Sequence, residues 1–319
     1  MGLPVTVYRH TDAGAPVIRP QKPSDWLAIL KACLVDGYGD KSPLGWTLEF
    51  EDVASLKMVF KNNLADGGSG GAVQVESHDG TDGITSLVRF TAAGQITALD
   101  TYVEKCGYRV IGINTNTTFV GGWTVIGCGR AFYVRQEIGI PTWNQTSSGY
   151  YNYTPQYWIG DIESFIPNDQ HIFTMVSGNY ARQPSDDSTV VNYYASQLGG
   201  SSQGAAAQLY APDGSGVSVD YLWGNYLDGG NMSSGYSLDP SAMNVPLAMI
   251  PAILRHSGLS NTVNPAYRGT IPGLFVINFP AFWDQSIPIN KNFGGVDYEI
   301  GYGRSKASYV VQSSGEWYA

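Results

Sequence analysis

The segment from Cys33 to Trp46, CLVDGYGDKSPLGW, constrains the fold more than any other, because a helix must end in it and the chain must then reverse. The apolar residues around its start follow the i, i+3, i+4, i+7, i+8 spacing of one buried helix face: Trp26, Ile29, Leu30, Cys33 and Leu34. Ser24 is the expected N-cap of this helix, and Gly37 is its expected end. The sequence therefore predicts one short amphipathic helix laid against a sheet.

The residues after this helix are typical of a tight turn that leads into a strand. Glycine and proline interrupt regular structure, and the alternation of a strand resumes at Trp46. We interpret the turn as scaffold, and its carboxylates, Asp36 and Asp40, as part of that scaffold rather than as ligands. The predicted structural turn consists of Asp36, Gly37, Gly39, Pro43 and Trp46.

Most of the remaining chain reads as short strands rich in Val, Ile, Thr, Tyr and Phe and separated by turn residues. Asp-Gly pairs recur between them and favour tight hairpins. We expect a mainly β fold of antiparallel sheets, sandwich-like or barrel-like, with a weaker second helix over 97–105 and a helical turn or irregular segment over 245–257. The predicted strands are 4–10, 46–51, 56–61, 72–77, 84–91, 107–113, 123–127, 130–136, 156–159, 171–176, 273–277, 296–300 and 308–311.

The composition changes between residues 181 and 245, where Ser, Gly, Ala, Asn and Asp dominate. We therefore divide the chain into a β-rich module with the N-terminal helix (1–180), a Gly/Ser-rich inserted arm or subdomain (181–266) and C-terminal strands that complete the first module (267–319).

The charge balance argues against a nucleic-acid partner. The chain has 319 residues, of which 18 are basic and 27 acidic, giving a net charge of −9, whereas proteins that bind phosphate backbones gather Lys and Arg in patches.

The start of the sequence lacks the pattern of a signal peptide, and no apolar stretch reaches the length of a membrane span, so we expect synthesis in a cytosol. Cys33, Cys106 and Cys128 are expected to be reduced core residues, with a Cys106–Cys128 disulfide as the alternative.

Several stretches of the sequence resemble a family of tailed-bacteriophage virion structural proteins. They cover residues 4–180 and 267–319, and the chain departs from the family pattern at Cys128, where an acidic residue is commoner. The resemblance implies a particle component without an established activity, and it does not fix the part of the virion. The stretches that carry it are LVDGYG with the following Lys, Pro and Gly-Trp, then MVFKN (58–62), GWTVIG (122–127), RAFY (130–133), WIGDIESF (158–165), YRGTIPGL (267–274) and EWY (316–318).

Two patterns could carry chemistry. Gly67-Gly68-Ser69-Gly70-Gly71 matches the G-x-S-x-G elbow of serine hydrolases, but it is followed by a predicted strand instead of a helix, so a hairpin loop is the better interpretation. Asp161, Glu163 and Asp169 could serve a cation or a glycosidase, and we interpret them as a solvated turn with local capping. The histidines are isolated, at His10, His78, His171 and His256. We predict no catalytic residue, metal or cofactor.

Aromatic residues in predicted loops are candidates for contact surfaces, since Tyr and Trp among small polar residues suit protein or sugar. Core packing, a subunit interface and carbohydrate binding all remain open for them. The candidate interface or glycan contacts are Tyr150, Tyr151, Tyr193, Tyr194, Trp223 and Tyr226.

Together these features predict a non-enzymatic virion component that is assembled in the bacterial cytoplasm and contacts itself and other virion proteins, without nucleic acid or membrane insertion. We expect a position in the tail, neck or baseplate. The alternatives are a capsid decoration protein and a tail module that binds a host-surface glycan.

Overall fold

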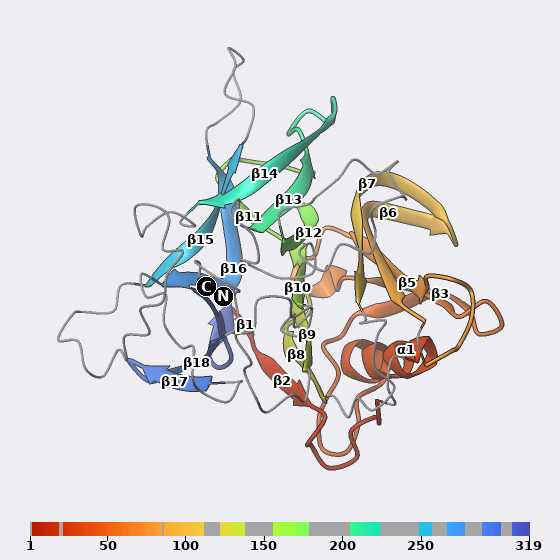
Figure 1. Ribbon diagram of the computed structural model, residues 1–319. Helices are drawn as coiled ribbons and strands as arrows, with labels where there is room; N and C mark the ends of the chain where they lie inside the picture. Colours follow the sequence, from red (N-terminus) through yellow and green to blue (C-terminus); the bar gives the residue numbers. More distant parts are fainter. Residues whose placement is uncertain are drawn as a thin grey trace, which may run out of the picture.

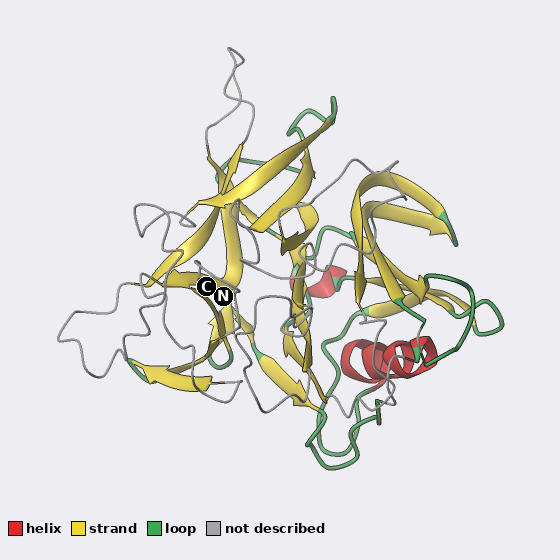
Figure 2. Ribbon diagram, viewed as in Figure 1, coloured by secondary structure: helices red, strands yellow, loops and turns green. Residues whose placement is uncertain are grey.

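A computed structural model describes residues 2–18, 22–84, 86–111, 122–137, 156–178, 205–223, 249–256, 267–277, 289–300 and 308–319. Strands dominate these residues, and the sheets are antiparallel throughout, which confirms the predicted fold class. Figure 2 shows the helical residues gathered on one side of a molecule made mainly of strands.

Helix α1 (Pro23–Lys31) starts with a proline and continues into a wider, π-helical turn over Ala32–Asp36. The turn ends at Gly37, whose φ of 78° confirms the predicted end of the helix. The predicted N-cap is wrong, because the helix already begins at Pro23 and the side chain of Lys22, at the cap position, makes no capping bond. The cap comes instead from Asp82, whose carboxylate accepts the Ser24 backbone N–H (2.9 Å) and hydroxyl (2.8 Å).

The turn after the helix runs back along the helix end. The backbone N–H of Leu44 donates to Cys33 O and that of Trp46 donates to Leu34 O, both at 3.0 Å. The indole of Trp46 is buried, donates to Cys128 O (3.1 Å) and packs edge-on against Phe132. This turn therefore joins the helix to the sheets. The two carboxylates of the turn, Asp36 and Asp40, are exposed.

The first sheet is a five-stranded antiparallel meander in chain order. The predicted helix over 97–105 is wrong, because this range spans the tight connection between the last two strands, with Asp100 at a φ of 63°. Its apolar residues belong to a small cluster on the sheet, with Ile96, Leu99 and Tyr102 beside Val59. The strands are β3 (Thr47–Asp52), β4 (Lys57–Lys61), β5 (Ala72–Ser77), β6 (Val88–Ala98) and β7 (Thr101–Ile111).

A second sheet contains most of the other described strands. Its order is β17-β18-β19-β16-β15-β14-β13-β12-β10-β9-β8-β2, and β11 (Glu163–Ser164) pairs with β16 beside this path. The strands are β2 (Thr6–Arg9), β8 (Gly122–Gly127), β9 (Ala131–Glu137), β10 (Gln156–Asp161), β12 (Phe173–Gly178), β13 (Ala205–Tyr210), β14 (Val217–Trp223), β15 (Met249–His256), β16 (Tyr267–Ile277), β17 (Ile289–Phe293), β18 (Val296–Ile300) and β19 (Ser308–Gln312).

This sheet places the segments differently from the expected domain division. Strands β13, β14 and β15 come from the range 181–266 and lie in the middle of the sheet, between β12 and β16, instead of in a separate arm. Strand β15 also replaces the helical turn expected over 245–257, and Pro251 is accommodated next to a register shift in its pairing with β16. The C-terminal strands β16, β18 and β19 share the sheet with β8–β10 and β12.

Strands β8, β9, β10 and β12 form a central layer that is buried on both faces. One face packs against α1 and the five-stranded sheet, through residues such as Val125 and Phe132. The opposite face packs against the part of the large sheet that curls back over it, through residues such as Ile126 and Trp158. The two sheets thus form a sandwich-like arrangement around shared strands (Figure 1).

The two chain ends meet. Strand β1 (Leu3–Pro4) pairs with β20 (Glu316–Trp317) in a separate two-stranded sheet, and Figure 1 shows the termini side by side. All three cysteines are free and buried, as the sequence predicts.

Candidate functional site

A buried carboxylate connects the two sheets. Asp161, at the end of β10, is fully buried and accepts hydrogen bonds from the Ser69 backbone N–H (2.9 Å), the Ser69 hydroxyl (2.6 Å) and the Asn62 amide (3.0 Å). Arg130 Nε lies 3.5 Å from the same carboxylate. Burial raises the pKa of Asp161, although the Ser69 hydrogen bonds and the Arg130 charge oppose this shift. Asp161 therefore holds the β4–β5 loop of the first sheet against the second.

Ser69 does not sit in a nucleophile elbow. Its loop leaves a short 3-10 turn at Leu64–Asp66 and enters strand β5, so no helix follows the serine. The loop connects a hairpin, as predicted, and Asp161 fixes its position. Gly71 is required by close packing, since a Cβ there would overlap the ring of Phe173.

The other two predicted carboxylates do not join Asp161. Asp169 is almost completely buried at its side chain and forms an ion pair with Arg268 (2.8 Å), whereas Glu163 is exposed on β11. The prediction of a solvated turn is therefore wrong for Asp161 and Asp169. Both act as anchors because buried carboxylates need charged or hydrogen-bonding partners.

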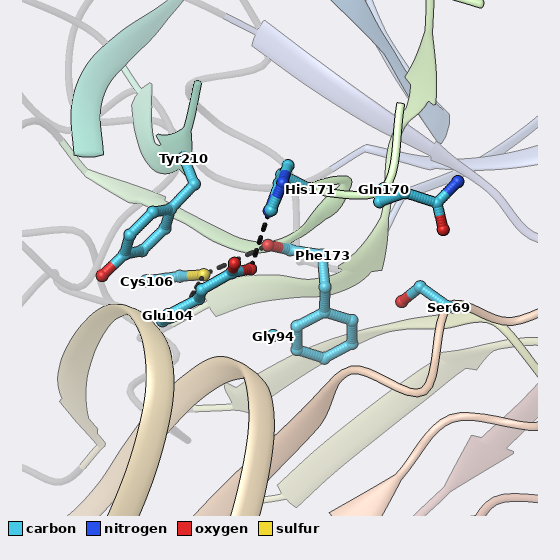
Figure 3. A pocket seen from close by; sticks show the side chains of 8 residues that line it. All are labelled: Ser69, Gly94, Glu104, Cys106, Gln170, His171, Phe173 and Tyr210. Carbon is cyan, nitrogen blue, oxygen red and sulfur yellow. Dashed lines mark hydrogen bonds and ion pairs between the residues drawn. The ribbon is translucent and has the colours of Figure 1, made fainter. Parts of the chain in front are cut away.

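A small polar pocket lies beside this connection, where the β6–β7 hairpin meets the start of β12 and the end of β13 (Figure 3). Its volume is about 30 Å³. Ser69 reaches one end of it, and the other lining residues are Gly94, Glu104, Cys106, Gln170, His171, Phe173 and Tyr210.

The main polar contact in the pocket joins Glu104 Oε2 and His171 Nδ1 at 2.9 Å, with side chains that are 29% and 19% exposed. Glu104 has a φ of 57°, and Gly94 opposite it has no side chain to obstruct the carboxylate. Cys106 Sγ donates to Phe173 O at 3.2 Å. Burial, assisted by the Glu104 charge, raises the pKa of the Cys106 thiol to about 12, so the thiol is protonated and unreactive at neutral pH.

Burial also raises the pKa of Tyr210, with further contributions from Cys106 and Glu104. Its phenol therefore stays neutral across the physiological range. The loop between β13 and β14 passes next to His171, since a Cβ on Gly214 would lie 3.2 Å from the imidazole. Asp213 on this loop has a lowered pKa, chiefly through hydrogen bonds with Ser215, with a smaller contribution from His171.

The aromatic residues proposed from the sequence as contacts cannot be placed. Tyr150, Tyr151, Tyr193, Tyr194 and Tyr226 lie outside the described residues, and Trp223 is described only through its backbone at the end of β14. The pocket residues Glu104 and Tyr210 were not singled out from the sequence, and His171 was treated as isolated because its partner Glu104 lies 67 positions away.

Within the ranges that the structure describes, no three His, Cys, Asp or Glu side chains are grouped so that they could hold a metal ion. No helix in these ranges combines the length and the apolar character needed to cross a bilayer. Comparisons of this chain with protein family models, with curated proteins and with solved structures gave no match.

Proposed function

We propose that this protein is a non-enzymatic structural component of a tailed-phage virion, placed in the tail, neck or baseplate and assembled through contacts with itself and with other virion proteins. The proposal starts from the sequence resemblance. The observation that supports it is the way in which the resembling stretches meet in the fold.

Four of these stretches converge on the Asp161 cluster. Asn62 comes from MVFKN, Arg130 from RAFY, Asp161 from WIGDIESF and Tyr318 from EWY. The hydroxyl of Tyr318 donates to Asp161 O, and its ring lies 4.0 Å from the Arg130 guanidinium. Residues from 62 to 318 therefore contribute to one buried connection.

Other resembling stretches contact one another as well. Trp158 Nε1 donates to Pro272 O at 3.1 Å, and the ring of Trp317 occupies the space over Gly273. These contacts join the resembling stretches into one structural unit. This supports a shared architecture, and the proposed virion role follows from that resemblance.

The test is to follow the chain in lysates of infected bacteria by density-gradient sedimentation and immunogold electron microscopy. We expect it to sediment with intact particles and the gold label to lie at the tail, neck or baseplate. Label on the capsid surface would favour the decoration role instead. Recovery of the chain only in the soluble fraction, with unlabelled particles, would overturn the proposal.

A further inference from the structure

The pocket in Figure 3 combines one carboxylate, two aromatic rings and room for one small group. This cavity volume of about 30 Å³ exceeds the roughly 10–15 Å³ that a cavity needs to hold one water molecule. A primary ammonium group is of similar size. The pocket can therefore admit the end of a lysine side chain.

The carboxylate of Glu104 can accept a further hydrogen bond. Its Oε2 atom faces His171 Nδ1, and this is the contact that the described part of the chain makes with the carboxylate. In the tautomer that carries its proton on Nδ1, His171 donates this proton to Oε2 of Glu104 and leaves the second carboxylate oxygen without a bond from the ring. The second oxygen is then the natural acceptor for a cationic donor, because charge-assisted hydrogen bonds are the stronger ones.

The walls of the pocket also suit a cation. Figure 3 shows the Glu104 carboxylate between the rings of Tyr210 and Phe173. The faces of aromatic rings attract ammonium groups within about 6 Å. Asp213 belongs to the loop that passes next to His171, and the whole chain carries a net charge of −9.

We propose that this pocket binds a single primary ammonium group, presented by a lysine side chain of another protein molecule. Glu104 accepts a hydrogen bond from the ammonium, and the Tyr210 ring packs against it. Ca²⁺ fits the pocket less well, because protein sites for it supply most of its roughly six to eight oxygen ligands and the pocket offers one carboxylate. The inference rests on this geometry alone, so it stands or falls independently of the proposed virion role.

The direct test uses methylammonium chloride as the probe and the full chain with ¹³C-labelled histidine. The His171 ring resonance should shift saturably, with half-saturation on the order of 10 mM or weaker, because a ligand of two heavy atoms gains little affinity. Tetramethylammonium chloride, which cannot donate a hydrogen bond, and KCl at the same ionic strength should give no saturable shift. Equal responses to all three salts would overturn the proposal.

Variants separate the site from a general charge effect. Glu104→Gln keeps the size of the side chain and removes its charge, so methylammonium binding should weaken at least about tenfold. Glu163→Gln removes an exposed carboxylate on β11 and should leave binding unchanged. Should Glu104→Gln fail to fold, Tyr210→Leu, which removes only the ring, should weaken binding severalfold. Unchanged binding in a folded Glu104→Gln or in Tyr210→Leu would contradict the assignment.

Discussion

Arg135 on β9 and Glu299 on β18 form an ion pair with both side chains fully buried, and Nη2 lies 3.2 Å from Oε2. The other oxygen of Glu299 contacts Arg9 on β2. Strand β2 is one edge of the large sheet, and β18 is next to the opposite edge. The contact therefore shows that the sheet curls until its two ends meet, which makes the structure barrel-like around the second core.

Glu299→Leu tests how far this ion pair stabilises the closure. Removing one partner of a buried pair leaves the other charge without its compensation, so the free energy of unfolding should fall by about 3–5 kcal/mol. Arg135→Met combined with Glu299→Leu should recover part of that loss, because neither charge then remains buried. Urea unfolding of both variants measures the difference. Losses that simply add in the double variant would show that the two side chains are not coupled.

A second prediction compares two glycines with almost the same φ, Gly37 at 78° and Gly67 at 79°. Gly37 has a ψ of 172°, a conformation that is almost restricted to glycine, and a Cβ there would lie 2.6 Å from Lys41 O. Gly67 is left-handed with nothing within 4 Å. Gly67→Ala should cost about 1 kcal/mol, and Gly37→Ala about 3 kcal/mol or more, as measured by thermal unfolding. Equal losses would mean that the turn at Gly37 can relax.

A third prediction concerns the cap of α1 by Asp82. Burial alone would raise the pKa of Asp82, but hydrogen bonds from Ser24 and the charge of Lys22 outweigh it and lower the pKa. The stabilisation is therefore present above the unfolded pKa of about 3.9 and is lost as the pH falls through the lower, folded value. Because the carboxylate is partly exposed, Asp82→Ala should cost only about 1 kcal/mol at pH 7.

The same experiment at acidic pH checks the sign. The difference between the wild type and Asp82→Ala should shrink as the pH falls below about 4. Ser24→Ala provides the matched control, since it removes the hydroxyl donor and keeps the backbone N–H bond. A difference that grows at low pH would show that the carboxylate acts in its protonated form.

The sequence predicts the strands best where alternation or β-branched residues continue to a turn. The predicted strand 72–77 coincides with β5, the predicted strand 46–51 is shifted by one residue from β3, and the predicted strand 56–61 begins one residue before β4. The helix predicted over 97–105 fails because a hairpin brings Leu99 and Tyr102 together as a helix turn would. Local spacing does not distinguish these two arrangements.

Long-range contacts could not be predicted in this way. The mutual proximity of Glu104, His171 and Tyr210 depends on how the β6–β7 hairpin packs on β12 and β13, and no local pattern encodes it. The burial of Asp161 likewise depends on a loop 92 residues away. An isolated charged residue in a sequence is usually exposed, and only the fold shows that this one is an anchor.

The final prediction concerns the C-terminal strand. Trp317 is 1% exposed, its ring lies over Gly273, and its indole N–H donates to Gln312 O at 3.1 Å. Trp317→Ala should therefore lower the free energy of unfolding by about 3–5 kcal/mol, as expected for a buried tryptophan. Deletion of the exposed Ala319 should have almost no effect and serves as the control.

Hydrogen exchange gives a second, local measurement of the same change. Because β20 pairs with β1, exchange in the Trp317→Ala variant should accelerate at Val5, whose N–H donates to Gly315 O. If Trp317→Ala unfolds like the wild type, the two chain ends do not hold the second core together.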